Sequence, residues 1–139
     1  MKIRTLSATT AALGALLTIG IAGPPAASAS PALASVSNFD LTFGATRLQG
    51  TIQWFDRSAV ISGSLKAVTG TRQGEFLGSG DDPGSGSCST FDERTAAAGT
   101  TVTFRFSRTC DINGGFDSFT VRLTDPAGSF LRQQIIQQP

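Results

Sequence analysis

Apolar and polar residues alternate along most of this chain, with a period of two residues. The clearest runs cover 102–106 and 119–123, where Val, Phe and Leu alternate with Thr and Arg. This period places alternate side chains on opposite faces of a β-strand, one buried and one in solvent. The turn-rich segment 111–115 separates the two runs. We therefore predict an antiparallel hairpin over 100–124, with Cys110 at its tip.

The same alternation predicts further strands along the chain. They cover 39–43, 47–54, 59–67, 72–77, 89–94 and 131–135. Segment 78–87 contains only Gly, Ser, Asp and Pro, so we expect a mobile surface loop there.

Seven or eight short strands separated by turns of Gly, Asp and Pro indicate an all-β protein. We predict a small antiparallel β-sandwich, immunoglobulin-like in outline, stapled by one disulfide. A small Greek-key barrel is the alternative way to close such strands. The last three strands are expected to form a meander.

The N-terminal residues have the pattern of a secretory signal peptide over 1–29. Lys2 and Arg4 precede an apolar run over 11–22, and Ala27-Ser28-Ala29 fits the small-residue cleavage pattern. A second possible cleavage site follows Ala34, and an uncleaved N-terminal anchor is the alternative. We expect a polar lead-in over 30–37, a single domain over 38–136, secretion, and no membrane span after cleavage.

The charge balance argues against nucleic-acid binding. Without Lys2 and Arg4, nine basic residues remain against ten acidic ones, and the basic residues are spread along the chain. Proteins that bind nucleic acid need clustered positive charge. We therefore predict no nucleic-acid partner.

Cys88 and Cys110 are the two cysteines of the chain. In an oxidising compartment they are expected to form a disulfide, and the alternative is two free thiols with a redox role. A loop of about 22 residues closed in this way stabilises the fold by roughly 3 kcal/mol in the chain-entropy model.

The chain contains no His and no Tyr. Ser-His-Asp and Cys-His catalytic sites and His-ligated zinc are thus excluded. A hydrolase that uses only carboxylates, such as Glu75 and Glu93, is the remaining enzymatic alternative. We predict that the protein is not an enzyme and binds no cofactor.

A calcium loop is the one metal site that the sequence suggests. Asp111, Asn113 and Asp117 have the spacing of oxygen ligands in such a loop. However, Phe116 replaces the required glycine, and Arg122 replaces the bidentate glutamate. The sequence therefore favours a turn capped by the aspartates over a calcium site.

Four of the phenylalanines fall near turns or uncertain edges rather than at core positions: Phe55, Phe91, Phe116 and Phe130. Phe55, Phe91 and Phe116 are the candidate residues of an exposed interaction patch. The alternative is that they plug the ends of the sandwich.

The turn over 123–128 and the disulfide near a late strand resemble those of the immunoglobulin-like apoproteins that carry enediyne chromophores in secreting bacteria. Those proteins have two disulfides, whereas this chain has cysteines for one. The resemblance implies the fold alone, and no site is transferred.

Together these features favour a small secreted, non-enzymatic binding module. Its target would be an extracellular protein or a cell-envelope component, bound through segments 78–87 and 111–115 at one end of a monomer. The alternatives are a carrier of an apolar small molecule in a Phe-lined cleft and a secreted protease-inhibitor-like protein.

Overall fold

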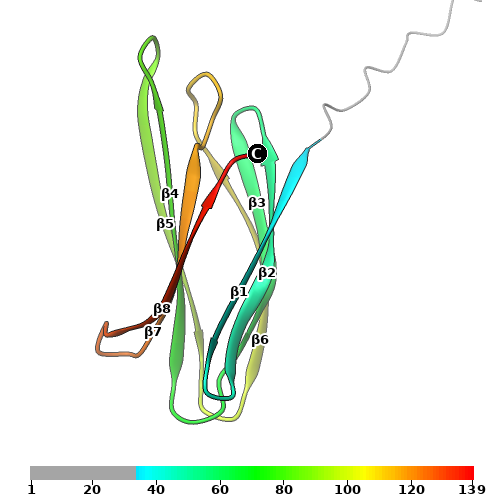
Figure 1. The fold of residues 1–139 in the computed structure, drawn as a ribbon, viewed down its shortest axis with the longest axis vertical. Helices are drawn as coiled ribbons and strands as arrows, with labels where there is room; N and C mark the ends of the chain where they lie inside the picture. Colours follow the sequence, from blue (N-terminus) through cyan, green and yellow to red (C-terminus); the bar gives the residue numbers. More distant parts are fainter. Residues whose placement is uncertain (1–33) are drawn as a thin grey trace, which may run out of the picture.

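The computed structural model describes residues 34–139, which form eight β-strands (Figure 1). The strands are β1 (Ser35–Phe43), β2 (Thr46–Phe55), β3 (Ser58–Lys66), β4 (Arg72–Asp82), β5 (Gly86–Ala96), β6 (Thr101–Thr109), β7 (Ser118–Thr124) and β8 (Phe130–Gln137). The signal peptide predicted over 1–29 lies outside the described residues. Within residues 34–139, no helix is long and apolar enough to cross a membrane.

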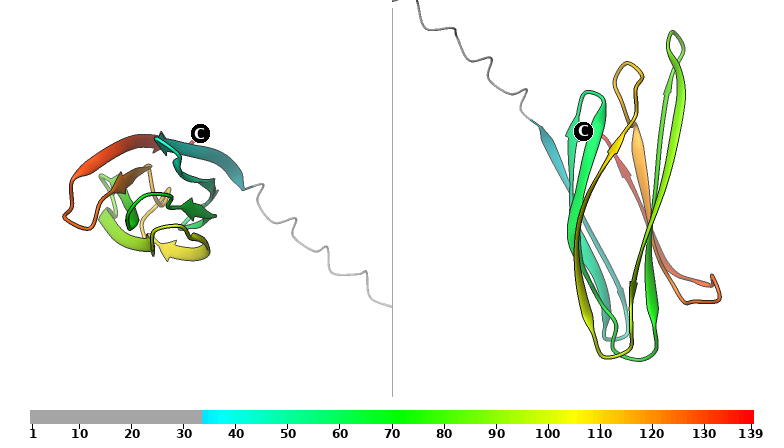
Figure 2. Two further views of the ribbon diagram at one scale, coloured as in Figure 1. Left: turned by 90° about the horizontal axis from the view of Figure 1, so that it is seen from below. Right: turned by 180° about the vertical axis from the view of Figure 1, so that it is seen from behind.

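The strands form two antiparallel four-stranded sheets, ordered β1-β2-β3-β6 and β5-β4-β7-β8. The sheets face each other and curve around a common core (Figure 2). The connections from β3 to β4, from β5 to β6 and from β6 to β7 each cross between the sheets. This confirms the predicted β-sandwich. The strands β2-β3-β6 face the strands β5-β4-β7-β8, which gives the immunoglobulin-like outline, and β1 is an additional strand at the edge beside β2.

The core contains a cluster of aromatic rings between the two sheets. The Phe76 ring lies 5.7 Å from Phe39, 5.2 Å from Phe104 and 5.3 Å from Phe106, measured between ring centroids. Trp54 is 2% exposed, and its indole N–H donates to the Ser37 hydroxyl at 2.9 Å. Because Ser37 belongs to β1 and pairs with Ile52, part of the predicted polar lead-in is strand.

The hairpin predicted over 100–124 is wrong. β6 pairs with β3, whereas β7 pairs with β4 and β8, so the last three strands do not form a meander. Segment 110–117 instead crosses from one sheet to the other. Its apolar residues Ile112 and Phe116 are 6% and 1% exposed, and Phe116 packs 4.9 Å from the Phe119 ring. Burial of these two side chains at the end of the core favours the crossing over a solvated hairpin tip.

The mobile loop predicted over 78–87 is also wrong, because β4 continues to Asp82 and β5 begins at Gly86. Gly78 and Gly80 are required by close packing and not by mobility. A Cβ at Gly78 would lie 2.7 Å from the Phe119 ring, and one at Gly80 would overlap the Gly115 carbonyl oxygen.

The predicted disulfide between Cys88 and Cys110 is confirmed. Cys88 lies on β5, at the edge of one sheet, and Cys110 directly follows β6, at the edge of the other. The bond therefore ties the two sheets together along one side of the sandwich. On the other side, the Asp40 amide of β1 donates to the Gln134 side chain of β8 at 3.2 Å.

An inward-pointing carboxylate, that of Asp92, lies between β5 and β6, four residues along β5 from Cys88. The Asp92 side chain is 7% exposed and forms ion pairs with Arg94, at 2.8 Å, and with Arg108. The Arg94 guanidinium also lies 4.6 Å from the centroid of the Phe106 ring. An inward charge at a sheet edge disfavours pairing with a foreign strand.

Replacing Asp92 by asparagine is expected to lower the free energy of unfolding by about 2 kcal/mol, because two partly exposed arginines lose their shared anion. Urea denaturation measures this change. Asp111→Asn is the matched control, since Asp111 forms an exposed ion pair with Arg57 worth less than about 1 kcal/mol. Equal losses in the two variants would contradict the structural role of Asp92.

Candidate interaction surface

The outer face of the sheet β5-β4-β7-β8 carries a row of apolar side chains that crosses all four strands. Phe91 lies opposite Leu77, Leu77 opposite Thr120, and Thr120 opposite Ile135. Phe91 is 54% exposed and Ile135 is 58% exposed. Both point away from the core, because their strand neighbours Asp92 and Ile136 are the buried residues.

A charged row runs beside the apolar row, two residues away from it on each strand. Glu93 lies opposite Glu75, Glu75 opposite Arg122, and Arg122 opposite Gln133. Arg122 lies 3.9 Å from the Glu75 carboxylate and donates to the Gln133 side chain at 3.1 Å. The Arg122 guanidinium is therefore held at one place on the face.

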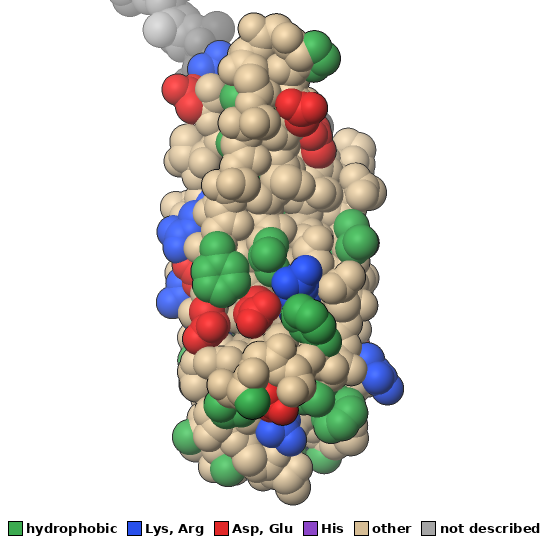
Figure 3. All heavy atoms as spheres, turned by 90° about the vertical axis from the view of Figure 1, so that its left-hand side faces the viewer, with side chains coloured by type: hydrophobic (Ala, Val, Ile, Leu, Met, Phe, Trp, Pro, Cys, Tyr) green, Lys and Arg blue, Asp and Glu red, His purple; other side chains and the backbone are tan. Residues whose placement is uncertain are grey.

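The same guanidinium lies 4.7 Å from the centroid of the Phe130 ring, which is 62% exposed. We call Leu77, Phe91, Phe130 and Ile135 the apolar patch. Figure 3 shows hydrophobic side chains gathered at mid-height of this face, with charged side chains beside them. Single exposed apolar residues are common, but neighbouring ones on a solvated sheet face indicate an interaction site.

The structure does not bring the predicted patch of Phe55, Phe91 and Phe116 together. Phe91 lies on the apolar patch. Phe55 is 39% exposed at the end of β2, in the other sheet. Phe116 is 1% exposed and fills one end of the core, so its inclusion was wrong.

Sequence reasoning missed Leu77 and Ile135, and it placed Phe130 near a turn without including it among the patch candidates. The alternation predicted over 131–135 placed Leu131 and Ile135 on the same face of a strand. In the structure Leu131 packs against the core, whereas Ile135 is exposed and Ile136, at 7% exposed, is the buried residue. An irregular register between β7 and β8 at Leu123 and Thr124 accompanies this change of phase. Consecutive apolar residues, as in Ile135-Ile136, were an available signal, because a strand must turn one of the two outward.

The three calcium candidates each have a different partner. Asp111 pairs with Arg57 at 2.7 Å, and Asp117 accepts from the Asp81 amide at 2.7 Å. The Asn113 backbone N–H donates to the Ser85 hydroxyl at 2.9 Å. Within residues 34–139, His, Cys, Asp and Glu form no group of three or more that could hold a metal ion.

The turn between β4 and β5 is fixed by its own hydrogen bonds. The Ser85 hydroxyl donates to the Asp82 carboxylate at 2.5 Å, and this bond is the main reason that the pKa of Asp82 is lowered from its ordinary value. The Ser85 amide also donates to the Asp82 carbonyl at 3.2 Å. This end of the molecule is thus a short, structured turn instead of the long variable loop expected there.

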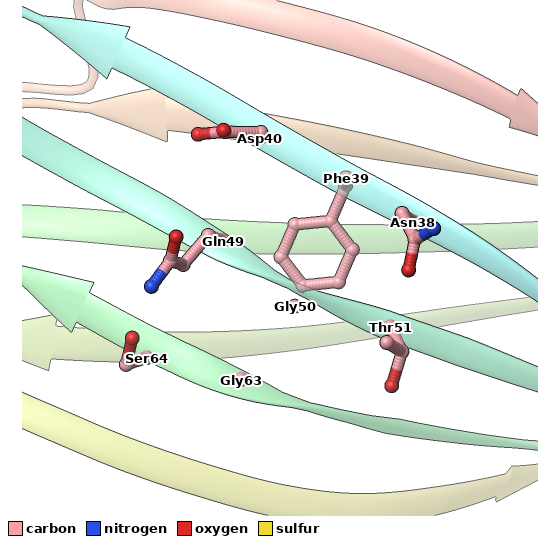
Figure 4. Close-up of a pocket in the computed structure, with 8 residues that line it drawn as sticks. All are labelled: Asn38, Phe39, Asp40, Gln49, Gly50, Thr51, Gly63 and Ser64. Atoms are coloured by element: carbon pink, nitrogen blue, oxygen red, sulfur yellow. The ribbon is translucent and has the colours of Figure 1, made fainter.

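A shallow depression of about 370 Å³ lies on the other sheet, over the paired glycines Gly50 and Gly63 (Figure 4). The residues around it are Asn38, Phe39, Asp40, Gln49, Gly50, Thr51, Gly63 and Ser64. Asp40 binds Arg47 at 2.6 Å, and hydrogen bonding to that guanidinium lowers the pKa of Asp40. The polar rim differs from the Phe-lined cleft that a carrier of an apolar ligand would need.

The fold and this surface define an immunoglobulin-like β-sandwich with an exposed, partly apolar outer sheet face. Comparison of the chain with models of protein families, with curated proteins and with solved structures found no match.

Proposed function

We propose that this protein is a secreted binding module that docks on another protein through the outer face of the sheet β5-β4-β7-β8. The exposure of Phe91, Phe130 and Ile135 on one rigid face carries the proposal, since each is more than half exposed. The signal-peptide pattern over 1–29 and the Cys88–Cys110 disulfide support an oxidising location outside the cytoplasm.

The composition of the face suits a protein partner. Aromatic residues and arginine are enriched among the residues that dominate binding energy, and here Arg122 is already stacked beside Phe130. Burial of the exposed part of each large apolar side chain contributes about 1 kcal/mol. Because the patch lies on paired strands, little conformational entropy is lost when it is covered.

Photo-cross-linking tests this proposal. A photoreactive phenylalanine analogue replaces Phe91, and the same analogue replaces Arg105 on the exposed side of β6 or Gly84 in the β4–β5 turn as matched controls. Cells that produce each full chain are irradiated, and the covalent products are analysed by mass spectrometry. We expect a protein cross-link from position 91 that exceeds those from positions 105 and 84.

Two outcomes would contradict the proposal. Equal cross-linking from all three positions would indicate random collisions. A product formed only from position 84 would place the binding surface at the end of the sandwich, as the sequence first suggested.

A further inference from the structure

We infer that the partner of this face is the same face of a second copy of the chain, so that the protein forms a symmetric dimer. This inference rests on the proposed function and adds the identity of the partner. It places the twofold axis along the strand direction, between β4 and β7 at the centre of the sheet. A dimer of this kind is isologous, because both copies use the same residues.

The arrangement of charges on the face is complementary to itself under this rotation. The axis brings β4 of one copy opposite β7 of the other and keeps every residue in its row. Glu75 therefore faces Arg122 of the second copy, and Arg122 faces the second copy's Glu75. Opposite charges that meet across an interface fix its register.

The apolar patch is complementary to itself under the same rotation. The axis also brings β5 of one copy opposite β8 of the other, so Phe91 faces Ile135 of the second copy. Leu77 faces the second copy's Thr120, whose methyl group continues the apolar contact. In the next row Ser79 faces Ser118, so no like charges oppose each other in these rows.

Other arrangements leave charges without partners. An axis perpendicular to the strands, through the apolar row, would place Glu75 opposite Ser79 and Arg122 opposite Ser118 of the second copy, so neither charge would meet a counter-charge. A wholly apolar partner surface would remove Glu75 and Arg122 from water without adding a counter-charge. The axis along the strands is therefore the one that the charges select.

The area of the face sets the expected strength of the dimer. Four strands about 4.8 Å apart and four outward rows about 6.8 Å apart cover about 500 Å² on each copy. The total of about 1,000 Å² is at the low end of specific interfaces. We therefore expect reversible self-association that depends on protein concentration.

Charge-reversal variants test the inference by sedimentation equilibrium of the purified full chain. Glu75→Arg puts four arginines at the dimer centre, and Arg122→Glu puts four carboxylates there. Each variant alone is expected to associate more than about tenfold more weakly than the wild type. An equimolar mixture is expected to recover association, because the arginine introduced at position 75 of one variant then meets the glutamate introduced at position 122 of the other.

The mixture separates the intermolecular contact from the contact within one chain. Both variants lose the internal Glu75–Arg122 pair, so only pairing between molecules can restore association. Arg105→Glu, a charge reversal on β6 away from this face, is the control and should associate as the wild type does. Phe91→Ser leaves the charges intact and is also expected to weaken association. It therefore still tests the interface if one of the charge-reversal variants does not fold.

A wild type that stays monomeric at about 1 mM, or a mixture that associates no better than its components, would overturn the dimer. If the cross-link from position 91 then joins a different protein, the proposed function stands and only self-association is refuted. If position 91 gives no product above its controls and the wild type is monomeric, both proposals fail. A cross-linked product of twice the chain mass, with recovery in the mixture, supports both.

Discussion

Replacing Gly80 by alanine is expected to lower the free energy of unfolding by about 3 kcal/mol. The added Cβ would overlap the Gly115 carbonyl oxygen and lie 3.1 Å from the Cys110 sulfur. Neither neighbour can retreat easily. Gly115 has a φ of +69° and packs against the Asp56 carbonyl, and Cys110 is held by the disulfide.

Urea denaturation compares this variant with Gly84→Ala, its matched control. A Cβ at Gly84 would have one neighbour, the Asp82 carboxylate at 3.4 Å, which is an ordinary contact. We expect a change within about 0.5 kcal/mol for the control. Equal effects at the two positions would show that segment 78–87 does not pack as strands.

Replacing both Cys88 and Cys110 by serine is expected to cost about 3 kcal/mol, because the disulfide closes a loop of 22 residues. In a domain of this size such a loss lowers the melting temperature by roughly 15 °C. Thermal unfolding followed by circular dichroism measures it.

A reductant provides the internal control for this variant. Reducing agent should lower the melting temperature of the wild type toward that of the double variant and leave the double variant unchanged. If the double variant has the same melting temperature as the oxidised wild type, the disulfide does not stabilise the fold by constraining the unfolded chain.

The sequence was sufficient to predict the strands but not their partners. The runs over 102–106 and 119–123 were both recognised as strands with the buried face assigned correctly at Phe104, Phe119 and Val121. However, alternation gives the phase of a strand and not its neighbour. Whether 110–117 forms a hairpin or a crossing depends on the space available for Ile112 and Phe116 at the end of the core.

Composition gave the wrong prediction at 78–87 for a related reason. Glycine and serine are typical of loops, but Gly78 faces the Phe119 ring, 41 residues away in the sequence, and Gly80 faces the Gly115 backbone, 35 residues away. The interaction surface depends on the same long-range information. Leu77 and Phe91 become neighbours only when β4 and β5 pair, and Ile135 joins them through β7 and β8.

The positions of the first and last strands, β1 and β8, determine how this domain responds to mechanical force. Ser35 begins β1 and Gln137 ends β8 at the same end of the sandwich (Figure 1). Tension applied at these two points peels β1 from β2 and β8 from β7 one hydrogen bond at a time, which is a weak direction of loading. The disulfide keeps 22 residues out of the stretched chain, so its full extension is shorter by about 70 Å.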